Sequence, residues 1–205
     1  MKPGPGKKRA ADGANASPSP ALRGASRAAQ PLARGMIHGR FQPFHNGHLE
    51  YLRGAAERSD EIWIGITNPD PARVQFEASD PLRHLPESNP YSYAERLLMA
   101  KAAAADLGLD ARAVHVIPFP VNEPELWPAY VPPGVTQYLR LFSAWGGTKL
   151  ERLRDAGYDV VVLDEGAEKE ISGAEVRAAM RTGDEWEALV PPGVVRVLRA
   201  LELVF

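Results

Sequence analysis

Cysteine is absent from this 205-residue chain, which excludes disulfides, thiolate metal sites and cysteine nucleophiles. A zinc site would therefore have to be built from histidines and carboxylates. The chain also lacks any run of about 18 or more apolar residues, and its amino end lacks the apolar stretch of a secretory signal. From these absences we expect a soluble, cytoplasmic protein with no membrane partner.

Three common site signatures are missing as well. The sequence contains neither the P-loop pattern G-x-x-x-x-G-K-[ST] nor the dinucleotide-binding pattern G-x-G-x-x-G, and it contains no H-E-x-x-H zinc motif. These absences argue against an ordinary P-loop enzyme and against a simple dinucleotide-binding fold. They also leave no recognisable pattern of zinc ligands.

Positive charge gathers at the amino end of the chain. Residues 1–34 carry seven Lys or Arg and one acidic residue, Asp12, whereas the whole chain has a net charge of −2. The segment is rich in Pro, Gly, Ala and Ser and has no aromatic residue, so it cannot bury enough surface to offset its ordering entropy. We expect a disordered basic tail over 1–34 and one domain over 35–205. Without aromatic side chains for base stacking, nucleic-acid binding by the tail is not favoured.

From Gly35 onward, runs with the period of strands alternate with runs with the period of helices. Ser92 and Glu95 form the pattern of a capping box, which marks the start of a helix that runs to Gly108. The alternation predicts an α/β, Rossmann-like fold: a doubly wound parallel sheet of about five strands with helices on both faces and a helical C-terminus. The expected strands are 36–39, 61–67, 114–119, 135–142 and 158–164, and the expected helices include 49–56 and 148–156.

The stretch H-G-R-F-Q-P-F-H-N-G-H, residues 38–48, lies where the first strand ends and a helix begins around Gly47 or His48. It admits three interpretations: a metal site, a tight turn or a phosphate cradle. His45 and His48 stand three residues apart, so both imidazoles can face the helix N-terminus, where Gly47 lets the backbone approach closely. No carboxylate follows at the spacing of a zinc ligand. Two imidazoles, Arg40 and the positive end of the helix dipole favour an anion, and phosphate above others.

A second constellation, E-I-S-G-A-E-V-R, occupies residues 170–177. Ser172 is the expected N-cap of a helix, Glu175 completes a capping box, and Arg177 lies one turn into the helix. The stretch is either a second phosphate contact or a well-capped helix without a ligand.

These two stretches resemble the signatures of the nucleotidylyltransferase superfamily. P-F-H-N-G-H (43–48) resembles its H-x-G-H motif, and I-S-G-A-E-V-R (171–177) resembles its I-S-S/G-T-x-x-R motif. With N-P-Y-S-Y-A-E-R (89–96) and V-P-P-G-V-V (190–195), the chain from about Met36 looks like the archaeal-type nicotinamide mononucleotide (NMN) adenylyltransferases. The resemblance implies a metal-dependent reaction in which an acceptor phosphate attacks the α-phosphorus of a nucleoside triphosphate in line and pyrophosphate leaves.

The resemblance also implies roles for individual residues. His45, His48 and Arg177 would be catalytic, binding the triphosphate and stabilising the phosphoryl oxygens during transfer. Mg²⁺ would accompany the triphosphate, and no metal site made by the protein itself is expected. The expected nucleotide- and phosphate-binding residues are Gly39, Arg40, Phe41, Gln42, Gly47, Ser172, Gly173 and Arg177.

Two departures from the archaeal pattern concern the substrates. Where the relatives carry an S-G-N turn that helps recognise adenine, this chain reads F-S-A-W-G-G (142–147). The relatives also carry an Asn three residues before a Trp that stacks on nicotinamide. The Trp matches Trp127, but the Asn position is Pro124, which has no side-chain donor or acceptor. The expected acceptor-binding residues are Arg96, Trp127 and Trp145, with Arg73, Arg83 and Lys149 as further basic candidates.

G-I-T-N-P-D-P (65–71) and L-F-S-A-W-G-G (141–147) resemble a bacterial branch that looks related to cytidylyltransferases attaching CMP to phosphonates in natural-product pathways, including antibiotic biosynthesis. The preferred hypothesis is a CTP-dependent enzyme acting on a small phosphonate such as phosphonoformate. The alternatives are an ATP-dependent NMN adenylyltransferase and a nucleotide-binding regulator without turnover. Residues 68–91 form either a mobile active-site loop or an inert insertion, and a homo-oligomer is compatible with the sequence.

Overall fold

A single five-stranded parallel sheet forms the centre of the computed structural model, with strand order β3-β2-β1-β4-β5. The structure describes residues 1, 4, 32–74, 76, 84–142, 144–165 and 171–205. The strands are β1 (Arg34–Gly39), β2 (Glu61–Thr67), β3 (Val114–Phe119), β4 (Val135–Leu141) and β5 (Val160–Glu165). The predicted Rossmann-like α/β fold with a parallel sheet is therefore confirmed.

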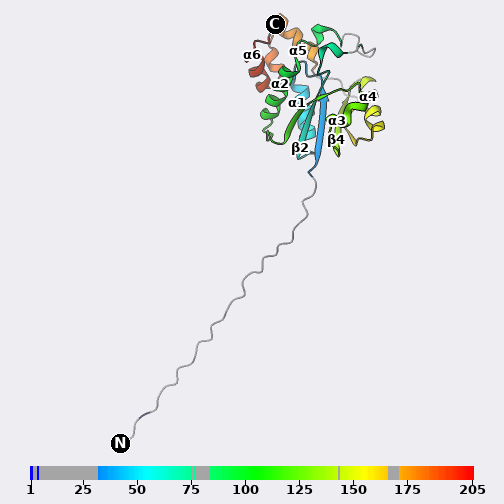
Figure 1. Cartoon of the computed structure of the whole chain (residues 1–205). Helices are drawn as coiled ribbons and strands as arrows, with labels where there is room; N and C mark the ends of the chain where they lie inside the picture. Colours follow the sequence, from blue (N-terminus) through cyan, green and yellow to red (C-terminus); the bar gives the residue numbers. More distant parts are fainter. Residues whose placement is uncertain (2–3, 5–31, 75, 77–83, 143, 166–170) are drawn as a thin grey trace. The chain divides into compact units, whose positions relative to one another are not determined.

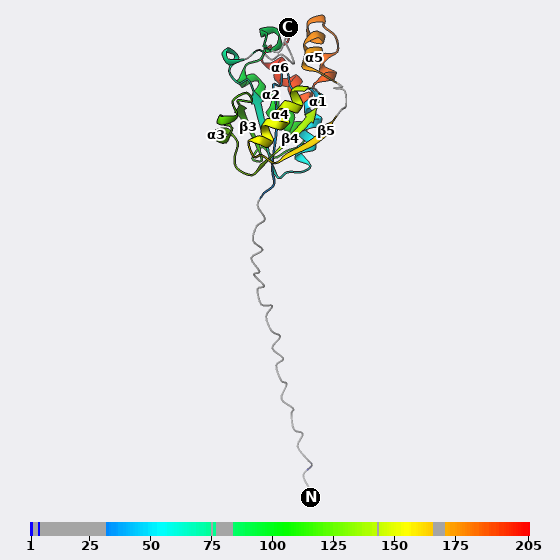
Figure 2. The ribbon, with the colours of Figure 1, turned by 90° about the vertical axis from the view of Figure 1, so that its right-hand side faces the viewer.

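Helices cover both faces of this sheet (Figure 1, Figure 2). α1, α2 and α6 pack on one face and α3 and α4 on the other, while α5 lies at the edge where the strands end (Figure 1). The helices are α1 (Asn46–Ala56), α2 (Tyr93–Asp106), α3 (Trp127–Tyr130), α4 (Ala144–Asp155), α5 (Gly173–Thr182) and α6 (Pro192–Ala200). Short 3₁₀ turns are η1 (Pro71–Arg73), η2 (Pro86–Ser88), η3 (Pro124–Leu126) and η4 (Trp186–Leu189).

Two helices differ from the expected boundaries. α1 begins at Asn46 because His45 already has the extended backbone of an N-cap. α4 begins at Ala144, four residues before the predicted start, and so takes in Gly146 and Gly147. Glycine lowers helix propensity, which hides this first turn from the sequence pattern. A Cβ at Gly146 would lie only 3.2 Å from a side-chain carbon of Leu141, so packing against β4 explains the small residue.

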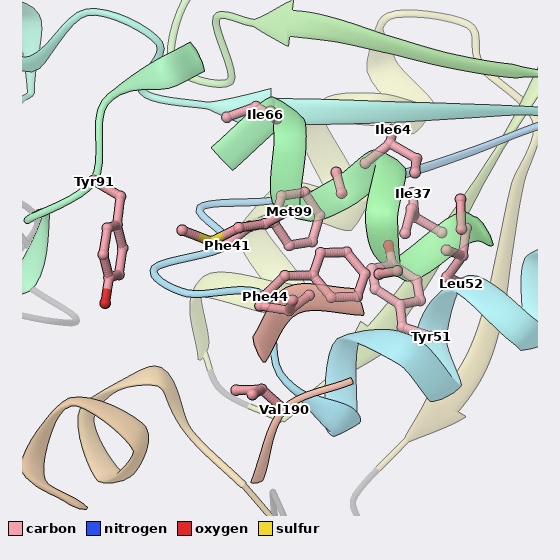
Figure 3. Close-up of a cluster of buried hydrophobic side chains, with 14 of the residues drawn as sticks. Ile37, Phe41, Phe44, Tyr51, Leu52, Ile64, Ile66, Tyr91, Met99 and Val190 are labelled. Carbon is pink, nitrogen blue, oxygen red and sulfur yellow. The ribbon is translucent and has the colours of Figure 1, made fainter. Parts of the chain in front are cut away.

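The side chains of β1 alternate between two hydrophobic clusters, one on each face of the sheet. Ile37 points into the larger cluster with Phe41, Phe44 and Leu52, while Met36 points into the smaller one. Figure 3 shows the larger cluster, in which the Phe41 and Phe44 rings lie together beside the loop that follows β1. This loop is therefore anchored in the core by its aromatic side chains, which fixes the start of α1.

Some predicted features lie outside the described residues. They include the disorder of most of the 1–34 tail and the central part of the 68–91 stretch, with Arg83. The helices that the structure describes include none that is long and apolar enough to cross a membrane.

The strand order places β1 at the point where the connections reverse direction. The chain moves from β1 outward through β2 and β3, then returns to the other side of β1 for β4 and β5. In open parallel sheets, ligands bind beyond the carboxyl ends of the strands at this reversal. The loop after β1 and the N-terminus of α1 lie there.

Candidate nucleotide site

His45 and His48 form a pair at the N-terminus of α1. Their rings stack with centroids 3.6 Å apart and planes inclined by 25°. The backbone N–H of His45 donates to Nδ1 of His48 at 3.3 Å, so the second ring is oriented by the cap of its own helix. His45 is buried and His48 half-buried. Both predicted histidines thus lie at the positive end of the helix, where an anion is stabilised.

The ring of Phe41 packs against the ring of His48. The Phe41 ring is fully buried and meets the His48 ring edge-on, with centroids 4.9 Å apart. Its φ of 53° is in the left-handed region, which turns the chain sharply after Gly39 and drives the ring into the core. The Phe41 side chain has no exposed surface, so the predicted nucleotide contact could come only from its backbone.

Gln42 ties the loop after β1 to a distant segment. Its side-chain amide donates to the carbonyl oxygen of Tyr91 at 2.9 Å, and its side-chain oxygen accepts from the backbone N–H of Tyr91 at 3.0 Å. This reciprocal pair uses the polar groups of the Gln42 side chain. Gln42 therefore positions the loop, and a direct contact of its side chain with nucleotide would require breaking the pair.

The second predicted motif begins α5. The hydroxyl of Ser172 accepts from the backbone N–H of Glu175 at 3.2 Å, and the Glu175 carboxylate accepts from the backbone N–H of Ser172 at 2.6 Å. The predicted capping box is confirmed. Hydrogen bonds with Ser172 hold the pKa of the Glu175 carboxyl below its usual range, so this group is ionised at neutral pH.

The two motifs meet through Gln42, Gly173 and Arg177. Nη1 of Arg177 donates to the carbonyl oxygen of Gln42 at 2.6 Å, and the arginine is 7% exposed. A Cβ at Gly173 would lie 2.7 Å from that same oxygen, so only glycine fits this contact. On the other side, a Cβ at Gly47 would lie 3.7 Å from the carbonyl oxygen of Ile171. The N-termini of α1 and α5 therefore lie close together, with His45 and His48 at the first and Arg177 on the second.

A chain with this sheet and this convergence matches known nucleotidyltransferases. The family model described as cytidylyltransferase-like matches residues 36–179. The chain belongs to the cytidylyltransferase-like family. The predicted nucleotidyltransferase class is therefore confirmed.

Individual relatives fall into two groups. The chain is 42% identical over 172 residues to the phosphonoformate cytidylyltransferase of Streptomyces viridochromogenes, covering 84% of this chain and 94% of the relative. It is 33% identical over 171 residues to the nicotinamide-nucleotide adenylyltransferase of Thermococcus onnurineus, covering 82% of this chain and 83% of the relative. Similarity to the first protein extends over nearly its whole length.

Solved structures confirm the fold of this family member. The crystal structure of a bifunctional NMN adenylyltransferase/ADP ribose pyrophosphatase from Francisella tularensis superposes with a TM-score of 0.61 at 16% identity, over 83% of this chain and 50% of that one. A structure of that bifunctional protein complexed with AMP and a manganese ion gives a TM-score of 0.57 at 15% identity, over 83% and 49% of the two chains. This chain thus spans half the length of that larger protein.

Nucleotidyltransferases generally use a divalent metal ion. Within the described ranges of this family member, no group of three or more His, Cys, Asp or Glu side chains could hold a metal ion. The pair His45 and His48 therefore lacks a third protein ligand among those residues. The chemistry of the site, with imidazoles and a guanidinium at two helix N-termini, suits phosphate oxygens.

Arg96, a predicted acceptor-binding residue, is buried and bound to the backbone. Its guanidinium donates to the carbonyl oxygens of Arg40 at 3.0 Å, Thr67 at 2.8 Å, Asn68 at 2.9 Å and Ser92 at 3.2 Å. Burial lowers the pKa of Arg96 to about 10, so the group keeps its charge at neutral pH. The side chain clamps the carboxyl end of β2 to the loop after β1, and these bonds leave little of its donor capacity for an acceptor.

The two predicted tryptophans lie on the α4 side of the sheet. Trp127 has no exposed surface, packs against Phe119 with ring centroids 5.4 Å apart, and donates from its indole N–H to the carbonyl oxygen of Pro120 at 2.9 Å. Trp145 is half-buried, with the guanidinium of Arg152 5.2 Å from its ring centroid. Of the two rings, Trp145 is the one with surface that an acceptor could reach.

Sequence reasoning missed Arg140 as part of the support for α1. Its guanidinium donates to the carbonyl oxygen of Gly47 at 3.0 Å and pairs with the carboxylate of Asp164 at 2.8 Å. The bond holds the first turn of α1 against β4 and β5. In sequence Arg140 is one charged residue in a strand, and only the strand order brings it beneath the motif.

Replacing Gly173 with Ala tests the contact between the motifs. We expect the new Cβ to push α5 away from Gln42, because the opposing atom is a backbone oxygen that cannot rotate aside. Protein stability should fall by about 1–3 kcal/mol, measured by chemical denaturation, and the KM for nucleoside triphosphate should rise. Gly147→Ala is the matched control: its Cβ would meet no atom within 4 Å, and alanine favours a helix. Equal stability changes in the two variants would contradict the assigned contact.

Replacing Arg96 with Met tests the clamp. Four carbonyl oxygens would lose a charged donor inside the protein, so we expect a loss of about 3 kcal/mol or more in the free energy of unfolding. Arg53→Met, which removes an exposed arginine paired with Glu50, should cost less than about 1 kcal/mol. If Arg96→Met unfolds at the same denaturant concentration as Arg53→Met, the hydrogen bonds of Arg96 do not contribute to the stability of the protein.

Proposed function

We propose that this chain transfers a cytidylyl group from CTP to a small phosphonate, releasing pyrophosphate. The observation that carries the choice of acceptor is the burial of Trp127. Resemblance to NMN adenylyltransferases would assign that ring to nicotinamide stacking, but it has no free face and the preceding Asn position is Pro124, the first residue of η3. The higher identity to the phosphonoformate enzyme, 42% against 33%, supports the same choice.

The proposed reaction is an in-line displacement on phosphorus. An oxygen of the acceptor phosphonate attacks the α-phosphorus of CTP, a new P–O–P bond forms, and the bond to the β-phosphate oxygen breaks so that pyrophosphate leaves. His45 and His48 would contact the α-phosphate, where charge on the oxygens changes during transfer. Ser172, Gly173 and Arg177 would hold the β- and γ-phosphates at the N-terminus of α5.

The remaining predicted contacts come from the loop after β1. Gly39 and Phe41 would offer backbone N–H groups, Gly47 would allow close approach of phosphate, and Arg40 would add a positive charge. Gln42 would act by holding the loop and Arg177 in place. Mg²⁺ is proposed to arrive with CTP, held by its phosphates, and to neutralise part of their charge. We assign the reaction to the cytoplasm, where nucleoside triphosphates are supplied.

Pyrophosphate release tests the proposed function directly. The protein is offered each of CTP and ATP with each of phosphonoformate and NMN in the presence of Mg²⁺, with incubations lacking acceptor as controls. We expect the largest kcat/KM for CTP with phosphonoformate. Turnover confined to ATP with NMN would instead establish the adenylyltransferase alternative. Nucleotide binding without turnover in every pairing would favour the non-catalytic regulator.

Replacing His48 with Ala tests the assigned role of the histidine pair. A contact made mainly in the transition state should lower kcat by about 10²–10³-fold with little change in CTP affinity. Steady-state kinetics and nucleotide binding by calorimetry separate the two effects. His115→Ala, which removes a histidine on β3, is the control and should leave kcat unchanged. The assignment is wrong if His48→Ala weakens CTP binding but the bound complex still turns over normally.

A further inference from the structure

Several buried polar side-chain atoms of the described residues lie on the α4 face of the sheet without a hydrogen-bond partner. Four of them are Nδ1 and Nε2 of His38, Oγ1 of Thr67 and Oε1 of Gln137. The three side chains are 2%, 2% and 0% exposed. Buried polar groups are nearly always hydrogen-bonded, and each exception requires an explanation.

The strand pairing places these three residues on one face of the sheet, with His38 between the other two. His38 pairs with Gly65 of β2, and Met36 pairs with Gln137 of β4. Thr67 is therefore the diagonal neighbour of His38 toward the carboxyl end of the sheet, about 8 Å away between Cα atoms, whereas Gln137 lies about as far away in the opposite direction along the strands. Side chains alternate along each strand, so all three point to the face that Met36 occupies.

The local charges favour an anionic group. Burial, and then the positive charge of Lys149 on α4, lower the pKa of His38 well below its ordinary value, so the ring is neutral at neutral pH. The side-chain amide of Gln137 raises the pKa of His38 by a smaller amount, although no hydrogen bond of normal geometry joins the two side chains. A neutral imidazole N–H, a threonine hydroxyl and a nearby ammonium are all suitable donors for a carboxylate. The Gln137 amide already donates to the sulfur of Met36 at 3.5 Å.

His38 lies close to the residues proposed to bind nucleotide. β1 lies at the reversal of the strand order, and the proposed nucleotide contacts His45 and His48 follow it at the N-terminus of α1. His38 lies on the opposite face, two residues before Arg40. An acceptor lying across the end of β1 could present one end to the α-phosphate and the other to His38.

We propose that His38 and Thr67 form a subsite for the distal carboxylate of a small phosphonate acceptor. This inference rests on the proposed function and adds the residues that would distinguish a carboxylated phosphonate from a simple one. Binding would give the polar atoms of His38 and Thr67 a partner, with a hydrogen bond from His38 to one carboxylate oxygen and from Thr67 to the other.

Paired variants and paired acceptors test this subsite. For the wild-type protein, kcat/KM is measured with phosphonoformate and with methylphosphonate, which lacks the carboxylate, and the KM for CTP is recorded. We expect phosphonoformate to be preferred by at least about tenfold, the worth of one hydrogen bond to a charged group. In His38→Leu and Thr67→Val this preference should approach one while the KM for CTP is unchanged. His115→Leu, on the same sheet face, should keep the preference.

The melting temperature of the protein without ligands gives a second measurement. Apolar replacement of an unpartnered buried group should leave it unchanged or raise it, whereas loss of a structural hydrogen bond should lower it. An intact preference for phosphonoformate in His38→Leu, or a fall in the melting temperature of both variants, overturns the subsite. If the wild-type protein releases no pyrophosphate with any pairing of substrates, the proposed function is wrong. The subsite is then tested by the melting temperatures of the variants alone.

Discussion

The hydrogen bond between Arg177 and the carbonyl oxygen of Gln42 joins the two halves of the nucleotide site, which are 135 residues apart in sequence. It requires α5 to approach the loop after β1 so closely that a side chain at Gly173 would overlap that oxygen. Gln42 itself is fixed by its paired bonds to Tyr91. The convergence of the helix N-termini therefore depends on one backbone carbonyl and the residue that holds it.

The two faces of the sheet serve different purposes around the end of β1. On the α1 side, buried aromatic rings anchor the loop after β1, and the Phe41 ring packs against His48. Arg140 on β4 donates to the first turn of α1. On the α4 side, a packed apolar layer around Met36, Phe119 and Trp127 lies beside His38 and Thr67, whose polar side-chain atoms have no hydrogen-bond partner. Since β1 separates these regions, one strand sets the distance between them.

The fold was largely predictable because its signals are local. Alternating strand and helix periods predicted the strands, and the capping boxes at Ser92 and Ser172 predicted two helix starts that the structure confirms. The motif residues His45, Gly47, Gly173 and Arg177 also come together as the resemblance implied. Their contacts with phosphate stay predictions, since the structure holds only the protein.

What the sequence could not provide depends on contacts between distant segments. An arginine in a helix and a tryptophan in a loop look available for ligands, yet Arg96 is used by four carbonyl oxygens and Trp127 is enclosed by the core. Burial of this kind follows from the packing of whole elements, which no local pattern reports. The place of His38 beside Thr67 likewise becomes visible only when the register of β1 with β2 is known.

The Arg96 clamp has an electrostatic consequence for the whole edge of the sheet. The carbonyl oxygens of Arg40, Thr67 and Asn68 lie at and just after the ends of two neighbouring strands, and all three accept hydrogen bonds from its guanidinium. A buried positive charge is thereby fixed at the edge of the sheet where the two motifs lie. A residue that need never touch the substrates can in this way make the local electrostatic potential more favourable for a polyanion.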